Sequence, residues 1–361
     1  MPAPRVSVLI PCYNYAQYVG RAIESVLGQT HDDLELIVVD NGSTDDSWQV
    51  IQQYHDPRLK SFRLEANRGM CGGWAFGLEQ CLGEWFSFLS ADDYLDSKKH
   101  EILLNYLAKH PEADVAGGYV EQVDSFGRRP EGTRWMEDVI NAPRDYNALE
   151  SWMNRHFLCI PAAFYRRELC VAPPDGLNGV ADYYFHLTLL RRGARFAQVQ
   201  EVLAYYRWHE DNTTRKERST VVEQFAYCFA MQLLPCLKES NQMGRAAETI
   251  CSFFELYTYL LRTTPRHDLG GIMLCMFWPE WVAENCPDFP ALVAVDWENR
   301  TDGHQFHGVR AMMNDAFLKW SHQSPAVPPA AATHKRQQKN TWWRNAGRSF
   351  ERRLRHFLRG R

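Results

Sequence analysis

Paired cysteines, long apolar runs and internal repeats are all missing from this sequence of 361 residues. Its ten cysteines form no Cys-x-x-Cys pair and show no regular spacing, which argues against a zinc site and against a disulfide framework. No stretch approaches the roughly 18 apolar residues of a membrane span, and the apolar run from Val6 to Ile10 is too short for a signal peptide. We therefore expect a cytoplasmic protein with reduced cysteines.

The charge of the chain is small overall but unevenly distributed. The net charge is −4, yet residues 335–361 contain ten Lys or Arg and one acid, Glu351. A Pro/Ala-rich linker, 324–334, precedes this basic tail, and residues 216–323 show the wide apolar stripes of packed helices. We therefore predict four parts, of which the first, 1–215, contains alternating strands and helices.

Strand and helix patterns alternate along this first part. The predicted strands are Arg5–Ile10, Leu34–Val39, Leu59–Leu64, Trp85–Leu89, Asp114–Val123 (as one strand or two), Cys159–Tyr165, Arg195–Val199 and Val202–Trp208. The intervening helices carry apolar residues every three or four positions, as at Val19, Ile23 and Val26. Such alternation is typical of an α/β protein with a doubly wound, mostly parallel sheet.

Two adjacent carboxylates, Asp92 and Asp93, follow the apolar strand Trp85–Leu89. In an open α/β sheet, ligands bind just beyond the carboxyl ends of the strands. Neighbouring carboxylates repel each other unless a cation or hydrogen-bond donors compensate their charge. A metal site is therefore one interpretation, and a helix-capping loop, with Ser97 following closely, is the other.

Six short motifs occur in a recognisable order over about residues 5–215. They are Ser7-Val8-Leu9-Ile10-Pro11-Cys12-Tyr13-Asn14, Val38-Val39-Asp40-Asn41-Gly42-Ser43-Thr44-Asp45, Asn67-x-Gly69, the Asp92-Asp93 pair, Ala181-Asp182, and Tyr206-Arg207-x-His209-x-x-Asn212-Thr213. With these motifs the sequence resembles the second family of inverting nucleotide-sugar glycosyltransferases. The resemblance implies a GT-A fold and transfer of a sugar from a nucleotide diphosphate to a hydroxyl group.

The resemblance also implies a nucleotide site. Its expected residues are Pro11, Tyr13, Asn14, Asp40, Asn41, Asn67, Gly69, Ala91 and Asp92. Tyr13 would stack on the base, and Asp40 would accept a hydrogen bond from a uracil or thymine N–H, which favours a UDP-sugar. Simple packing of Tyr13 and an Asx-turn cap by Asp40 are the alternatives.

A divalent metal site follows from the same resemblance. Asp92 would bind Mn²⁺ or Mg²⁺ bridging the two phosphates, with Asp93 beside it and His209 reaching the metal or the diphosphate. Such hard cations prefer oxygen ligands and neutralise a leaving diphosphate. A structural role is the alternative for a histidine that follows a strand.

Asp182 is the expected catalytic base. An inverting transfer needs a carboxylate that removes the proton of the attacking hydroxyl group. Asp182 lies at the start of a predicted helix, where the helix dipole favours a negative charge. The alternative is an N-cap of that helix, and both roles are compatible.

Three positions depart from the family pattern. Ser90 stands where an acid is usual, Ala181 stands where Glu usually precedes the base, and Trp74-Ala75 replaces a common Arg-Asn pair. These departures keep open the alternative of a catalytically silent sugar-nucleotide-binding or scaffold protein. A nucleotidyltransferase is disfavoured, because Pro11-Cys12-Tyr13-Asn14 replaces the Gly-rich, Arg-containing phosphate loop after the first strand.

The basic tail predicts a membrane-surface contact. Apolar residues recur every three or four positions from Trp343 to Phe357, beside a parallel stripe of arginines. A basic amphipathic helix of this kind lies in a membrane interface. The expected acceptor is a saccharide, a lipid-linked sugar or a protein. No base-reading motif supports nucleic-acid binding.

Overall fold

The computed structural model describes residues 4–130, 145–154 and 158–210, together with Asn141, Asn212, Gln224, Cys228, Gln232 and Cys236. Gln224, Cys228 and Cys236 lie on helical backbone, and the helical character of the region 216–323 stays a prediction. The rest of that region, the linker and the basic tail lie outside the described residues.

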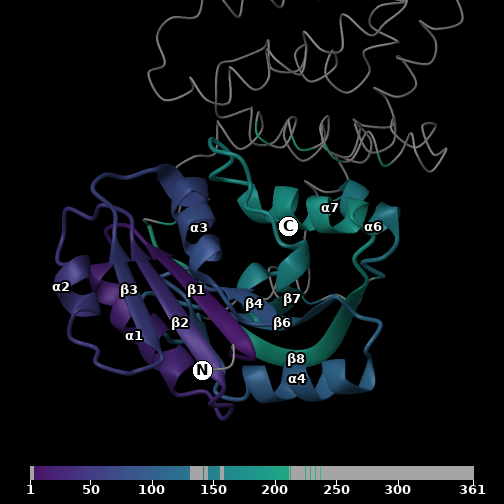
Figure 1. Cartoon of the computed structure of the whole chain (residues 1–361), viewed down its shortest axis with the longest axis horizontal. Coiled ribbons are helices and arrows are strands. Elements are labelled where there is room, and N and C mark those ends of the chain that lie inside the picture. The colour runs from purple at the N-terminus through teal and green to yellow at the C-terminus, as the bar shows by residue number, and fades with distance from the viewer. Residues whose placement is uncertain are drawn as a thin grey trace, which may run out of the picture.

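Eight strands form one mixed sheet in the described part of the chain (Figure 1), in the order β3-β2-β1-β4-β7-β6-β8-β5. The strands are β1 Val6–Cys12, β2 Leu34–Asp40, β3 Leu59–Arg63, β4 Trp85–Phe88, β5 Tyr94–Leu95, β6 Val115–Val123, β7 Ala163–Arg166 and β8 Phe196–Arg207. β1 pairs in parallel with β2 and β4, and β2 with β3, whereas β7 is antiparallel to its neighbours. The predicted α/β class with a mostly parallel sheet is confirmed.

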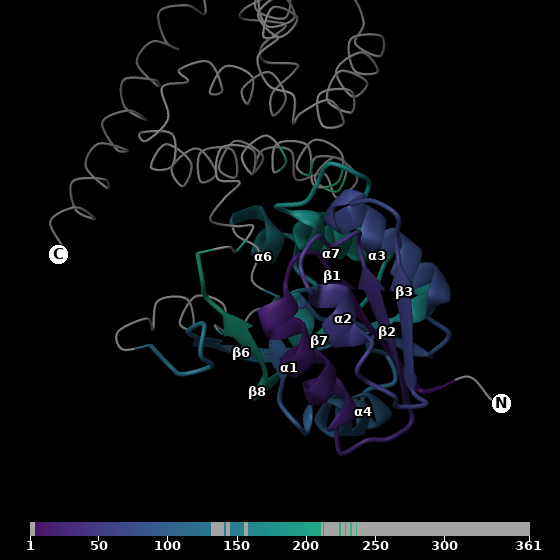
Figure 2. The ribbon, with the colours of Figure 1, turned by 90° about the vertical axis from the view of Figure 1, so that its left-hand side faces the viewer.

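Helices cover both faces of this sheet (Figures 1 and 2). They are α1 Ala16–Leu27, α2 Ser47–Ile51, α3 Gly69–Gln80, α4 Lys99–Lys109, α6 Leu149–Asn154 and α7 Ala181–Arg191. Every residue of β2 is buried: Ile37 and Val39 belong to the hydrophobic cluster on the side of α3, whereas Leu36 and Val38 belong to the cluster on the side of α1. A strand covered on both faces needs apolar residues at successive positions, which explains the run in β2.

Three predicted strands differ from the structure. The predicted strand Cys159–Tyr165 begins as a 3₁₀ turn, Ile160–Ala162, and only then becomes β7. Pro161 explains the turn, because its fixed φ and missing N–H suit the first residues of a helical turn. The two strands predicted over 195–208 are one strand, β8, whose pairing with β6 shifts register around Tyr119.

Among the described residues, every helix falls short of the length and apolar character needed to cross a lipid bilayer. The cysteines in the described part of the chain are all free, as the sequence predicts.

Candidate functional site

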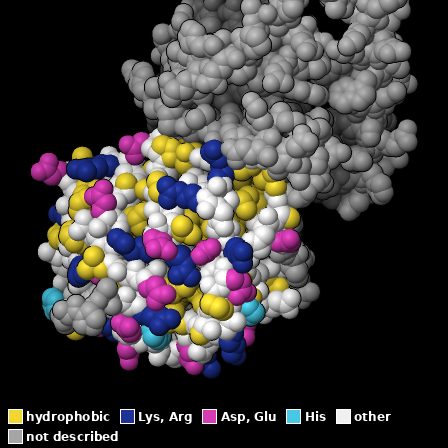
Figure 3. Space-filling view, turned by 45° about the vertical axis from the view of Figure 1, so that its right-hand side comes forward, with side chains coloured by type: hydrophobic (Ala, Val, Ile, Leu, Met, Phe, Trp, Pro, Cys, Tyr) yellow, Lys and Arg dark blue, Asp and Glu magenta, His cyan; other side chains and the backbone are white. Residues whose placement is uncertain are grey.

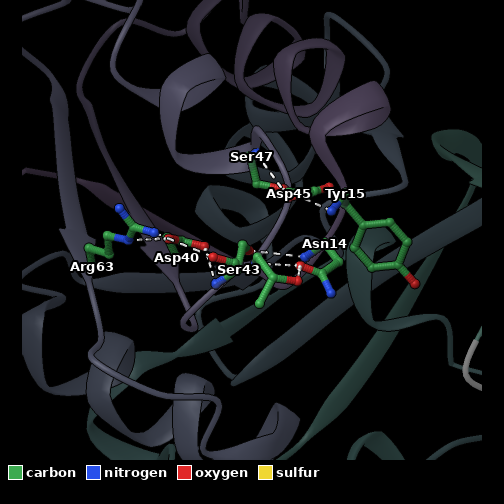
Figure 4. A network of polar contacts seen from close by, with 8 residues as sticks. Asn14, Tyr15, Asp40, Ser43, Asp45, Ser47 and Arg63 are labelled. Carbon is green, nitrogen blue, oxygen red and sulfur yellow. Dashed lines mark hydrogen bonds and ion pairs between the residues drawn. The ribbon is translucent and has the colours of Figure 1, made fainter.

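Asp40 lies fully buried at the carboxyl end of β2. Its Oδ1 accepts a hydrogen bond from the Ser43 N–H at 3.1 Å, so the predicted turn-capping bond is present. Its Oδ2 lies 3.2 Å from Nε of Arg63, the β3 residue paired with it (Figure 4). That contact is not aligned for a hydrogen bond, so among the described residues Oδ2 remains an acceptor without a donor. Asp40 therefore caps the turn with Oδ1 and keeps Oδ2 as an acceptor for a further hydrogen bond.

The loop after β1 packs against this turn. Asn14 has the left-handed φ of +56°, a conformation that Asn tolerates better than most residues. Its N–H donates to Oγ of Ser43 at 3.0 Å, and its Oδ1 accepts from the Thr44 N–H at 2.8 Å (Figure 4). The preceding Tyr13 side chain is 39% exposed, which leaves its ring accessible to a ligand. Pro11, near the end of β1, is half-buried.

The Gly69 turn is fastened to the end of β2 by two asparagines. Nδ2 of Asn41 donates to the Gly69 carbonyl at 2.8 Å and to Oδ1 of Asn67 at 3.1 Å. Oδ1 of Asn41 accepts from the Arg68 N–H at 3.0 Å, and Gly69 itself has a φ of +73°. The side chain of Asn41 thus shapes the turn through bonds within the protein.

Trp74 is a core residue of α3. Its ring lies 4.3 Å from that of Phe88 and 5.1 Å from that of Phe185 (centroid distances), and only 1% of the residue is exposed. The position where the family commonly has an arginine therefore faces the interior between α3, β4 and α7. A cation for the diphosphate cannot come from this position.

Asp92 meets a histidine 117 positions away in the sequence. Nε2 of His209 lies 3.0 Å from Oδ2 of Asp92, and both residues are buried. Asn212 fixes this pair, because its Nδ2 lies 3.3 Å from the same Oδ2 and its Oδ1 accepts from the His209 N–H at 2.6 Å. Ala91, just before Asp92, is buried in the core.

Asp93 faces a different partner. Its Oδ1 accepts the backbone N–H of Arg207, the last residue of β8, at 2.8 Å. Burial, together with the charge of Asp92, raises the pKa of Asp93 well above its usual value. Asp93 therefore ties β8 to the strand end, and its place in the metal site stays a prediction.

Asp182 is the second residue of α7, and the N-cap is Val180. The N-cap interpretation of Asp182 is therefore wrong, and Oδ1 of Asp182 accepts from the adjacent Tyr183 N–H at 2.8 Å. Buried Ala181, Tyr183 and Phe185 anchor this end of α7 in the core. Asn178, in the loop before α7, accepts the Met70 N–H at 3.0 Å and so connects the segment of the predicted base to the Gly69 turn.

The residues at this sheet edge fit a divalent cation that takes most of its ligands from a substrate. Asp92 and His209 offer an oxygen and a nitrogen 3.0 Å apart, close enough for both to bind the same cation. No group of three or more His, Cys, Asp or Glu side chains lies close enough to form an all-protein metal cage in the described ranges. Mg²⁺ and Mn²⁺ sites of phosphate-processing enzymes use one or two protein ligands plus phosphates and water.

The sequence interpretation gave no task to three neighbours of the predicted site residues. Arg63 was not singled out, although a cation at the end of the strand next to Asp40 is a usable signal once the strand order is known. Arg207 was quoted only as part of a motif and Asn178 not at all, because their partners lie 115 and 108 positions away.

Comparison with known proteins agrees with this geometry. The family model for glycosyl transferase family 2 matches residues 7–171. An uncharacterised glycosyltransferase of Nostoc sp. is 31% identical over 237 residues, covering 62% of this chain and 70% of that protein. A putative teichuronic acid biosynthesis glycosyltransferase of Bacillus subtilis, TuaG, is 29% identical and covers 56% of this chain and 79% of its own. The chain belongs to glycosyl transferase family 2.

Solved structures show the same fold. Residues 1–349 of Staphylococcus aureus TarS, in complex with UDP-GlcNAc, superpose with a TM-score of 0.59 at 18% identity, covering 90% of this chain and 93% of that one. The mannosyltransferase PcManGT of Pyrobaculum calidifontis, in complex with GDP-Man and Mn²⁺, gives 0.50 at 17% identity, with 89% and 88% coverage. The fold is of the predicted GT-A type.

Proposed function

We propose that this protein is a metal-dependent inverting glycosyltransferase that moves a sugar from a nucleotide-diphosphate sugar to a hydroxyl acceptor. The observation that carries this proposal is the contact of Asp92 with His209 at 3.0 Å, in a family 2 chain whose Asp40 keeps a buried acceptor at the end of β2. A UDP-sugar is favoured, because Oδ2 of Asp40 can accept the imide N–H of uracil. TarS, whose fold this chain shares, was solved with UDP-GlcNAc.

Each residue has one task in this proposal. Tyr13 stacks on the base and Asp40 orients it, while Asp92 and His209 hold Mn²⁺ or Mg²⁺ against the diphosphate. The cation supplies charge neutralisation of the leaving diphosphate. Asp182 accepts the proton of the acceptor hydroxyl as that oxygen attacks the anomeric carbon from the face opposite the diphosphate.

Surface polysaccharide or glycoconjugate assembly is the process that we propose for this reaction. TuaG, a relative over 56% of the chain, is named for teichuronic acid biosynthesis, and chondroitin synthase of Escherichia coli is 35% identical over 217 residues. A saccharide, a lipid-linked sugar or a protein would carry the acceptor hydroxyl. A cytoplasmic enzyme that contacts the membrane surface through residues 335–361 would meet a lipid-linked acceptor where it is displayed.

A panel of UDP-, GDP- and dTDP-sugars tests the proposal. The full chain is incubated with each donor and either Mn²⁺ or EDTA, and the released nucleotide is measured. We expect Mn²⁺-dependent release of the nucleotide from one or a few UDP-sugars. This release should be lost in Asp92→Ala. It should be kept in the control Asp33→Ala, which removes an exposed carboxylate just before the start of β2.

Two other outcomes of this screen would contradict parts of the proposal. Equal release with Mn²⁺ and EDTA removes the metal from the mechanism. Binding of UDP without release from any donor, with or without candidate acceptors, favours the catalytically silent binding protein.

A further inference from the structure

Arg207 is a buried arginine at the carboxyl end of β8, and 5% of it is exposed. Its guanidinium carbon lies 4.8 Å from the ring centroid of Tyr18 on α1 and 5.4 Å from that of Tyr94 on β5. Two aromatic faces therefore restrict the guanidinium plane, a geometry that Arg adopts and Lys does not.

The donors of Arg207 are directed at the strand end that carries the two aspartates. Nε donates to the Asp92 carbonyl at 2.7 Å, and the backbone N–H donates to Oδ1 of Asp93 at 2.8 Å. The Arg207 carbonyl accepts from Nδ2 of Asn212 at 3.0 Å, the amide that also touches Oδ2 of Asp92. Arg207 thus fixes both the backbone and, through Asn212, the carboxylate of Asp92.

The Arg207 side chain also contacts the turn that follows β6. Nη1 donates to the Ser125 carbonyl at 2.8 Å, and the Tyr94 hydroxyl donates to the Gly127 carbonyl at 3.4 Å. Asp124 closes this turn by accepting the N–H groups of Phe126 and Arg128, each at 2.9 Å. Ser125 and Phe126, together with His209 and Tyr18, line a pocket of about 630 Å³.

We propose that Arg207 is a positioning residue that locks Asp92, and with it the pocket wall at Ser125, into the geometry that binds the cation. The inference rests on the proposed function, because it concerns the same metal site. It assigns Arg207 no contact with substrate. Residues that orient metal ligands in this way commonly change metal affinity or activity by about 10- to 100-fold when they are replaced.

A role of Arg207 through its charge and a role through its geometry predict opposite effects of its replacement on cation binding. If Arg207 only contributed positive charge, its removal in Arg207→Met would strengthen cation binding, and Arg207→Lys would leave it unchanged. If Arg207 positions Asp92, both variants weaken cation binding, because neither Lys nor Met has a donor at the position of Nε, which bonds to the Asp92 carbonyl. If Arg207 is only structural, the variants lower the melting temperature and leave cation binding unchanged.

Binding of Mn²⁺ in the presence of UDP separates these cases. Free Mn²⁺ is measured by electron paramagnetic resonance on the full chain, well below the melting temperature of each variant. We expect Arg207→Lys and Arg207→Met both to bind Mn²⁺ about 10- to 100-fold more weakly than the unmutated protein. Tighter binding in Arg207→Met, or unchanged binding in both variants, overturns the proposal.

Arg166→Lys is the matched control. The Arg166 guanidinium also lies 4.8 Å from an aromatic ring centroid, that of Trp85, and its Nε donates to Oδ1 of Asp114 at 2.8 Å, but it pairs with the start of β4 rather than its end. Its replacement is expected to leave Mn²⁺ binding unchanged. Should the Arg207 variants not fold, Tyr94→Leu loosens one stacking face, and unchanged Mn²⁺ affinity in that variant overturns the inference.

The unmutated protein distinguishes this inference from the function on which it rests. No Mn²⁺ binding with UDP in the unmutated chain contradicts the proposed metal site itself. Mn²⁺ binding that is equal in the unmutated chain and the Arg207 variants contradicts only the role of Arg207.

Discussion

Adjacent residues of the same type have different environments in this protein. Asp92 meets a histidine and an amide, whereas Asp93 binds a backbone N–H and has a raised pKa. Lys98 is exposed, whereas its neighbour Lys99 is fully buried, with Nζ 2.6 Å from Oγ of Ser87. Burial lowers the pKa of Lys99 well below 10.5.

Lys99 predicts how stability changes with pH. Between its lowered folded-state pKa and 10.5, the unfolded chain binds more protons than the folded one, so stability rises with pH. In the pH range just below 10.5 we expect the unmutated protein to gain up to about 1.4 kcal/mol per pH unit relative to Lys99→Met. The measurement is urea unfolding across this range, and Lys98→Met is the control that keeps the rise. Parallel curves for the unmutated protein and Lys99→Met would contradict the prediction.

The role of Asp182 is tested by a change that keeps its shape. Asp182→Asn retains the size and the bond to the Tyr183 N–H but loses the basicity, so we expect transfer to fall by about 10²- to 10⁴-fold. Donor affinity should change little, because Asp182 is proposed to act on the acceptor. Initial rates and donor binding of Asp182→Asn are compared with those of the control variant Asp33→Asn. Near-normal transfer by Asp182→Asn would show that another group is the base.

At the scale of elements, α3 lies unusually close to β1. A Cβ at Gly77 would overlap the side chain of Leu9, so only glycine permits this approach. The same helix begins at Gly69 and packs Trp74 against Phe88. Close packing of α3 therefore sets the position of the turn that we assign to the nucleotide.

Gly77→Ala should destabilise the protein through this contact. Overpacking of a well-filled core costs about 1–3 kcal/mol, and we expect a loss in that range. Leu9→Val shortens the opposing side chain, so the double variant should lose less than the two single losses combined. Denaturant unfolding of all four proteins gives the cycle, and strictly additive losses would mean that the two residues do not meet.

For the whole molecule, the distribution of charge decides what the basic tail can bind. Figure 3 shows acidic and basic side chains interspersed over the described part of one face of the domain. Because the two signs are interspersed there, this face offers the basic residues no patch of one sign, whereas an anionic membrane surface contributes about 1 kcal/mol per basic residue. We therefore expect the membrane surface to be the partner of residues 335–361.

Truncation tests this partner. A chain that ends at Ser324 should still fold and release nucleotide from the donor, because the sheet and the proposed site precede it. It should no longer sediment with liposomes that contain anionic lipid, whereas the full chain should. Neutral liposomes are the control, and equal sedimentation of both chains with anionic liposomes would exclude the tail as the anchor.

The sequence by itself determined the local elements and the order of the motifs. Apolar periodicity located β1 to β4 and the helices α1, α4 and α7 to within a few residues, because a strand or helix buried on a known face must repeat apolar residues at its own period. It placed Asp40 and the Asp pair at the ends of buried strands, where a sheet of this class binds its ligands. These features depend on neighbours along the chain.

Only the tertiary structure decided which polar residues share the site. His209 and Asn212 select Asp92 and not Asp93 from more than a hundred positions away, and the same fold turns Trp74 into the core. The N-cap interpretation of Asp182 failed because the helix begins earlier, with Val180, two residues before Asp182, as its N-cap. A shift of one residue at a strand end or helix start turns every following side chain to another face. Contacts with distant segments set these end points, and no periodicity in the sequence records them.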